Sequence, residues 1–184
     1  MPTTNPKVET LQYDIVKGSK TIGTILATKS TLNNESKYEL TSSVSFRFIG
    51  EISIKSVFKT HFTDDVLTYA FSENLLNDKQ KEFSEIQWDG NQYHVQLKKE
   101  NKTIENEKIT YSMLSLYYQE PKHVQQVFSE RFAEYCQIKE IETDKYELTL
   151  PDGNKNYYYY QDGICTRVEV ERTLMDVAFI LQEE

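Results

Sequence analysis

The chain has 184 residues, of which 38% are hydrophobic and 12% aromatic, and this length can bury the core of one domain without disulfides or metals. With only 6 Gly and 4 Pro, the composition excludes a low-complexity or disordered chain. The formal charge of -8 repels phosphate backbones on average, so we expect no nucleic-acid partner.

The first segment, residues 1–10, is polar and holds two prolines, and we expect it to be disordered or flexible. We expect residues 11–183 to form a single antiparallel β domain, because no linker or internal repeat divides them. The domain begins with a predicted hairpin, in which strands over 11–16 and 21–28 are joined by a tight reversal at 17–20.

Two neighbouring stretches, residues 38–49 and 52–63, alternate apolar and polar side chains and are separated only by Gly50 and Glu51. At about 3.3 Å per residue, each predicted strand spans about 40 Å, which is twice the usual length. One apolar face and one polar face are typical of an antiparallel sheet with one side in water. Strands of this length indicate a sheet that curls around the rest of the chain.

The middle of the chain alternates in shorter stretches. We expect polar loops over residues 29–37 and 73–81, and a polar turn region over residues 100–108. The Asp-Gly-Asn sequence at 89–91 tolerates positive φ and separates two alternating strands, which predicts a hairpin.

A helical interruption is predicted near residues 111–132, where apolar residues are spaced three and four apart rather than two. Pro121 suits the first position of a helix, and Val124, Phe128 and Phe132 lie on one stripe of it. We expect this short helix to pack on a sheet edge or to cap one end.

The C-terminal part contains four consecutive tyrosines. Alternation places Tyr157 and Tyr159 on one face of a strand and Tyr158 and Tyr160 on the other. The outward pair is either a contact surface for a glycan, a lipid headgroup or a partner, or ordinary cross-strand packing with the hydroxyls in water.

Together these elements predict an all-β fold. We expect a long antiparallel meander of about ten to twelve strands, curled into a half-open or closed barrel around the one short helical segment. The concave side of such a sheet must be filled, either by the protein's own side chains or by a ligand. The candidate lining residues for a hydrophobic ligand are Phe46, Phe48, Phe58, Phe62, Trp88 and Tyr93.

The sequence contains no pattern typical of catalysis or of a metal site. His61, His94 and His123 lie in different predicted elements without ligand spacing around them. A Gly-x-Ser-x-Gly elbow and a glycine-rich phosphate loop are both absent. We therefore predict no enzyme activity, no cofactor, and no catalytic or metal-binding residue.

The two cysteines, Cys136 and Cys165, lie in different predicted strands. The sequence leaves open whether they form a disulfide or remain as two thiols. Simple alternation along the strand over 164–172 places Cys165 on the same face as Arg167 and Glu169.

The longest apolar run, residues 177–181, is far short of the about 20 residues that a membrane-spanning helix needs, so we expect no membrane span. Residues 1–10 lack the apolar core of a secretion signal. We therefore expect the protein in the cytoplasm, or in the periplasm or cell envelope if a leader has been removed.

Three groups of short motifs carry a resemblance to a known family. They are Tyr13-Asp14-Ile15 followed by Gly18 and Gly23, then Leu116-Tyr117 and Glu120-Pro121 leading to Phe128-Ser129-Glu130-Arg131, and finally Tyr160-Gln161-Asp162-Gly163 leading to Val168-Glu169-Val170. The chain resembles a family of bacterial cell-envelope proteins that carries a domain-of-unknown-function label, and the likeness covers nearly its whole length. The resemblance implies export from the cytoplasm and an antiparallel, partly open barrel, and it brings no catalytic residues.

Two hypotheses about function follow. The first is a non-enzymatic envelope protein whose curled sheet binds or shields a hydrophobic or amphipathic ligand, such as a lipid-like small molecule. The second is a structural or protein-interaction module that binds an envelope protein through a sheet edge or through exposed tyrosines. A dry cavity between sheet and helix favours the first hypothesis, and a concave face filled by the protein's own side chains contradicts it.

Overall fold

The computed structural model describes residues 5–47, 49–171 and 176–183. Over these residues the chain forms one 14-stranded antiparallel sheet and a short 3-10 helix. The elements are β1 (Lys7–Lys17), β2 (Lys20–Leu32), β3 (Glu35–Arg47), β4 (Glu51–Thr63), β5 (Val66–Leu76), β6 (Lys79–Trp88), β7 (Gln92–Leu97), β8 (Asn101–Glu105), η1 (Met113–Tyr117), β9 (Gln126–Ser129), β10 (Glu134–Glu142), β11 (Lys145–Thr149), β12 (Lys155–Gln161), β13 (Ile164–Val170) and β14 (Val177–Leu181).

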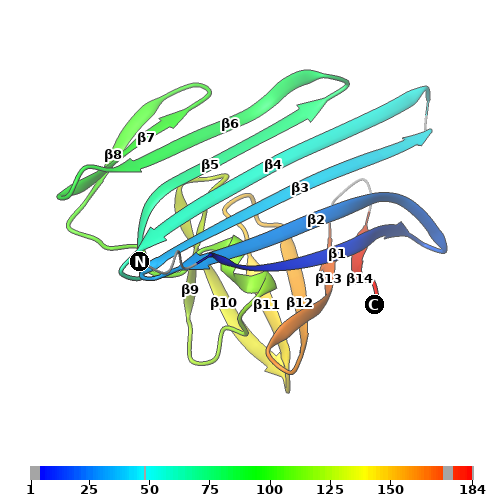
Figure 1. The fold of residues 1–184 in the computed structure, drawn as a ribbon. Coiled ribbons are helices and arrows are strands. Elements are labelled where there is room, and N and C mark those ends of the chain that lie inside the picture. Colours follow the sequence, from blue (N-terminus) through cyan, green and yellow to red (C-terminus); the bar gives the residue numbers. More distant parts are fainter. Residues whose placement is uncertain (1–4, 48, 172–175, 184) are drawn as a thin grey trace.

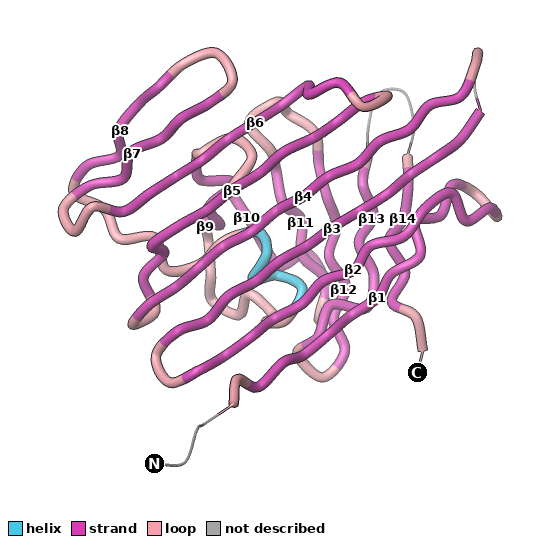
Figure 2. Tube along the Cα trace, turned by 45° about the horizontal axis from the view of Figure 1, so that its top comes forward, coloured by secondary structure: helices cyan, strands magenta, loops and turns pink. Residues whose placement is uncertain are grey.

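The strands follow one another across the sheet as a meander, and β1 joins its two halves by pairing with β14. The long strands β1 to β6 form one layer, the shorter strands β9 to β14 cross beneath it, and η1 lies between the layers (Figure 1). Figure 2 shows η1 beneath the long strands from a second direction. The edge strands β8 and β9 do not pair with each other within the described residues. The predicted all-β, barrel-like fold is therefore confirmed, and the barrel is not closed.

The two long predicted strands are confirmed as β3 and β4. They pair residue by residue, from Glu35 opposite Thr63 to Arg47 opposite Glu51. The first strand, β1, begins at Lys7, so the predicted start of the domain at residue 11 was too late. Residues 1–4 of the predicted flexible segment lie outside the described residues.

Tight turns let the strands extend into stretches that were predicted as loops. Asp64–Asp65 and Asn77–Asp78 have positive φ at both residues, between 49° and 60°, as in type I′ hairpin turns. Short Asx side chains tolerate this conformation. The polar stretch 73–81 is therefore the tip of the β5–β6 hairpin rather than a loop, and 29–37 is likewise the β2–β3 hairpin. The polar region 100–108 contains β8.

The helical interruption is confirmed only as the five-residue η1. The second helix predicted from Pro121 was wrong, because Val124 donates to the Pro121 carbonyl in a single turn and His123 then takes a φ of 63°. The chain continues as the extended strand β9, in which Phe128 lies opposite Tyr135 of β10. Pairing with β10 satisfies the backbone groups that a helix would otherwise satisfy internally.

A β-bulge reverses the predicted face of Cys165. Tyr159 lies opposite Arg167 and Tyr160 lies opposite Cys165, so β13 contains Thr166 as an extra residue. The extra residue shifts the alternation, and Cys165 is buried in the core, whereas Arg167 forms an ion pair at a half-exposed position.

Gly23 allows β2 and β3 to approach closely at one end of the sheet. It pairs with both Ile15 of β1 and Val44 of β3. A Cβ atom at this position would lie 2.8 Å from the Cα atom of Val44 and closer still to the Ser43 carbonyl oxygen. Only a residue without a side chain fits here.

Candidate functional site

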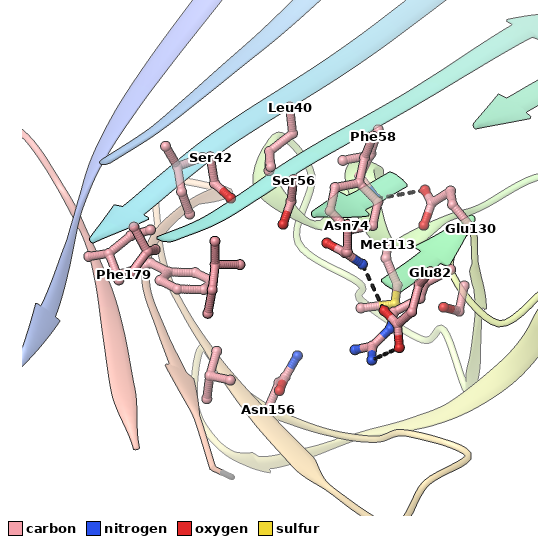
Figure 3. A pocket seen from close by; sticks show the side chains of 18 of the residues that line it. Leu40, Ser42, Ser56, Phe58, Asn74, Glu82, Met113, Glu130, Asn156 and Phe179 are labelled. Atoms are coloured by element: carbon pink, nitrogen blue, oxygen red, sulfur yellow. Dashed lines mark hydrogen bonds and ion pairs between the residues drawn. The ribbon is translucent and has the colours of Figure 1, made fainter. Parts of the chain in front are cut away.

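A cavity of about 480 Å³ lies between the two layers of the curled sheet. Small-molecule sites usually occupy about 300 to 1,000 Å³. Side chains of both layers and of η1 form its walls (Figure 3). The apolar lining residues are Ile15, Ile25, Leu40, Val44, Ile54, Phe58, Leu75, Leu76, Met113, Leu114, Tyr117, Phe132, Leu150, Tyr158, Val170, Val177 and Phe179. We call this part of the interior the cavity end.

A row of polar side chains crosses the long-strand wall of the cavity. Ser42 of β3 lies opposite Ser56 of β4, which lies opposite Asn74 of β5. Asn74 in turn lies opposite Glu82 of β6. All four side chains line the cavity, so this register differs from the apolar rows beside it. We call these four residues the polar row.

The polar row ends in an ion pair with the other layer. The Asn74 amide donates to Glu82 Oε2 at 2.8 Å, and the Arg131 guanidinium donates to Glu82 Oε1. The Arg131 guanidinium also lies 4.8 Å from the ring centroid of Phe132. Its Nε is buried and finds no acceptor among the described residues. Lys81, which is exposed, lines the cavity beside Glu82.

Glu130 is a buried carboxyl group, 1% exposed, next to this ion pair. Its Oε1 accepts a hydrogen bond from the Leu114 backbone N–H at 3.1 Å, and its carbonyl accepts one from the Ser84 hydroxyl. Burial raises the pKa of the Glu130 carboxyl, while hydrogen bonds from backbone N–H groups and from Ser112 oppose that rise. These contacts tie η1 and β6 to the end of β9, so Glu130 holds the cavity wall in place.

The opposite end of the interior is filled by tyrosine rings, and we call it the closed end. Tyr13 packs edge-on against Tyr117, with ring centroids 5.4 Å apart. The Tyr13 hydroxyl donates to the Cys165 carbonyl at 2.7 Å, and the Tyr160 hydroxyl donates to the Leu116 carbonyl at 2.8 Å. The hydroxyls of Tyr13 and Tyr160 thus each have a partner, which is the usual requirement for tyrosine in a core.

The five described residues of the predicted lining set do not all line the cavity. Phe58 lines the cavity. Phe46 is half-buried at the margin of the core, Phe62 packs edge-on against Tyr38, and Trp88 packs on Tyr93 with ring centroids 4.6 Å apart. Phe48 lies outside the described residues. The ligand-binding role assigned to this set stays a prediction.

Ser42 and Ser56 were missed by the sequence analysis. They occupy inward positions in the alternation of the two long strands, between Leu40 and Val44 and between Ile54 and Phe58. The signal was present as a polar interruption at matching positions of two paired strands. Arg131 carried no such signal, because it is far from Glu82 in the chain.

The two cysteine thiols lie outside the cavity lining. Cys136 and Cys165 are both free and buried, and burial raises the pKa of each thiol to about 12. Neither thiol therefore ionises near neutral pH, as a nucleophile would. No group of three or more His, Cys, Asp or Glu side chains is placed to hold a metal ion in the part of the chain that the structure describes.

His94 and the outward tyrosines have partners within the protein. His94 Nε2 lies 2.6 Å from Asp89 Oδ2 at an exposed site. The predicted faces of the tyrosine run are confirmed, with Tyr158 and Tyr160 buried. The Lys145 ammonium lies 5.9 Å from the ring centroid of Tyr157 and 5.1 Å from that of Tyr159.

Across residues 5–47, 49–171 and 176–183, no helix combines the length and the apolar character needed to cross a membrane.

The chain is similar to a known protein family in sequence and to a solved structure in fold. The chain matches, over residues 13–182, the model of a family described as a domain of unknown function, DUF6134. No curated protein matches the chain. A solved structure similar to it is the crystal structure of a beta-barrel-like protein of domain of unknown function DUF1849 from Brucella abortus. That likeness has a TM-score of 0.57 at 9% identity and covers 97% of this chain and 96% of the other, so it extends to the fold alone.

Proposed function

This chain belongs to the DUF6134 family, and we propose that its curled sheet is a non-enzymatic binding module for a small hydrophobic or amphipathic molecule. The observation that carries this proposal is the cavity of about 480 Å³ between the two layers, with a mostly apolar lining. The ligand lies between the long strands and the C-terminal strands, in contact with η1.

The energetics of the cavity support a ligand rather than an ordinary core. Protein interiors are close-packed, and a void of this size forgoes the contacts that its lining residues would otherwise make. An apolar chain placed there removes the lining from water, with a gain of about 25 cal/mol for each Å² of apolar surface. The loss of packing is therefore offset when the cavity is occupied.

We further propose that this role belongs to the cell envelope, in keeping with the family resemblance carried by the sequence motifs. There the protein shields or carries an amphipathic molecule that is poorly soluble in water. Fractionation of the host cells, with the chain followed by an antibody, tests the location separately from binding, and recovery in the cytoplasm alone contradicts it.

A protein-interaction role through the outward tyrosines is less favoured. The Tyr159 hydroxyl donates to Glu169 at 2.8 Å, and Lys145 covers the rings of both outward tyrosines. Their surface is therefore engaged by neighbours in the same sheet, as cross-strand packing predicts.

The experiment that tests the binding proposal compares two serine substitutions one position apart. Ser42→Phe places a ring in the cavity, whereas Ser43→Phe places the same ring on the exposed outer face of β3. We expect a fluorescent apolar probe to bind the wild type and Ser43→Phe equally well and to lose most of its affinity for Ser42→Phe. Equal binding to both variants, or no binding to the wild type, contradicts the proposal.

A further inference from the structure

We propose that the ligand is a single-chain amphiphile with a carboxylate head group, and that the head lies at the Arg131 end of the polar row. This inference rests on the proposed function and names the chemical class of its ligand. The aliphatic chain lies against the apolar lining, and the carboxylate takes hydrogen bonds from the polar row and its neighbours.

The polar row makes one part of the cavity wall polar, while the rest of the lining is mostly apolar. Ser42, Ser56 and Asn74 point into the cavity, and the row leads from β3 toward Glu82 on β6 (Figure 3). A wholly apolar ligand would exclude water from the Ser42 and Ser56 hydroxyls when it fills the space, which costs free energy. A molecule with one polar end and one apolar end fits both kinds of wall.

The carboxylate oxygens at the end of the row already accept hydrogen bonds from the protein. Both oxygens of Glu82 are engaged, Oε2 by Asn74 and Oε1 by Arg131. The Glu130 carboxyl is directed to the backbone N–H of Leu114. These are the acidic side chains that line the cavity.

The donors at this end have room for a further acceptor. Arg131 and Lys81 both line the cavity, Lys81 is exposed, and Arg131 meets Glu82 through one terminal guanidinium nitrogen, Nη2. A carboxylate in the cavity accepts hydrogen bonds from the Arg131 guanidinium and the Lys81 ammonium, and hydrogen bonds between ionised partners are about twice as strong as neutral ones. A cationic head would instead meet the positive charges of Arg131 and Lys81, and the charge of Glu82 is already paired with Arg131.

The size of the cavity limits the ligand to one chain. A volume of about 480 Å³ lies in the lower half of the range for small-molecule sites, which is about 300 to 1,000 Å³. The walls are continuous from β2 and β14 to the ion pair of Glu82 and Arg131, so a single extended chain reaches the polar row from the apolar end.

The test uses three amphiphiles that share one alkyl chain: palmitate, hexadecanol and hexadecyltrimethylammonium. Each displaces a fluorescent apolar probe from the full chain at neutral pH, below the concentration at which it forms micelles. We expect palmitate to bind about tenfold more tightly than hexadecanol, the gain of one charge-assisted hydrogen bond, and the cation to bind most weakly.

Three variants locate the head group. Arg131→Gln should reduce palmitate binding to the level of hexadecanol and leave hexadecanol unchanged. Arg167→Gln is the matched control, because Arg167 also pairs with a carboxylate but lines no part of the cavity, and it should change neither affinity. Glu82→Gln keeps Arg131 and removes its competing anion, so palmitate should bind several-fold more tightly, which preserves the test if Arg131→Gln fails to fold.

The outcomes separate this inference from the proposed function. Equal affinity for the three amphiphiles, a preference for the cation, or a palmitate preference that survives Arg131→Gln overturns the head-group assignment while the binding function stands. Failure of all three amphiphiles and of the probe to bind overturns the proposed function itself.

Discussion

The closed end and the cavity end are built on the same long strands and differ in what the second layer supplies. At the closed end, Tyr38 of β3 lies opposite Thr60 of β4. Four positions further along β3, at the cavity end, Ser42 lies opposite Ser56. Alternation points all four side chains inward, but rings fill the space at one end only.

The difference follows from the partners that each end provides. At the closed end, the segment around η1 offers backbone carbonyls to the tyrosine hydroxyls, as Leu116 does to Tyr160. The Tyr13 and Tyr160 rings can then be buried with their hydroxyls paired. At the cavity end, short polar side chains line the wall and leave space between the layers. One end is thus filled by aromatic rings, and the other contains the cavity.

The largest predicted effect is the loss of a ring at the closed end. Tyr13 is 0% exposed, and Tyr13→Ala removes both its packing on Tyr117 and its hydrogen bond to Cys165. We expect the free energy of unfolding to fall by about 3 to 5 kcal/mol. Phe58→Ala at the cavity end should cost only about 1 to 2 kcal/mol, because this half-buried ring already borders open space.

Urea unfolding followed by the fluorescence of Trp88 measures both losses. Tyr13→Phe separates the two contributions of the ring, since it keeps the packing and removes one hydrogen bond of about 1 kcal/mol. Equal losses in Tyr13→Ala and Phe58→Ala would contradict the distinction between the two ends.

The next effect is a loss of stability in alkali, which arises mainly at the closed end. Burial raises the pKa of Tyr13 and Tyr117 and raises that of the Cys136 and Cys165 thiols to about 12. The unfolded chain therefore ionises first, so the stability is complete below about pH 9 and falls as the pH rises further. Each group that ionises only in the unfolded chain lowers the free energy of unfolding by about 1.4 kcal/mol per pH unit.

Urea unfolding at a series of alkaline pH values measures this slope. Tyr13→Phe removes one buried titrating group and should make the slope shallower above about pH 10. Tyr157→Phe, at a half-exposed outward position, should change it less. A slope that Tyr13→Phe leaves unchanged would show that the Tyr13 hydroxyl titrates alike in both states.

Much of the fold could be predicted from alternation alone, and its limits are local. The long strands β3 and β4 show regular alternation, and their pairing followed from it. The end of the β5–β6 hairpin, residues 73–81, was predicted as a loop because its tip, Asn77–Asp78, lies among charged residues. The extra residue in β13, Thr166, leaves no mark in the sequence, since a bulge depends on the paired strand.

The candidate site was less accessible to prediction. A concave sheet was expected to be lined by phenylalanines, but most rings of that set pack elsewhere in the core or at its margin. The polar interruption at Ser42 and Ser56 was readable in principle, because both positions break the same inward face. The ion pair between Glu82 and Arg131 could not be predicted, because it depends on how far the sheet curls.

The smallest predicted effect comes from applying the pattern of the closed end to the cavity end. Ser56→Val replaces the centre of the polar row by an apolar β-branched residue, which should raise the free energy of unfolding by about 0.5 to 1 kcal/mol. Ser45→Val, on the exposed face of β3, controls for strand propensity and should raise it less. If the proposed head-group site is correct, Ser56→Val should also weaken palmitate binding relative to hexadecanol, because it removes a hydroxyl of the polar row. A destabilised Ser56→Val would assign Ser56 to the fold instead.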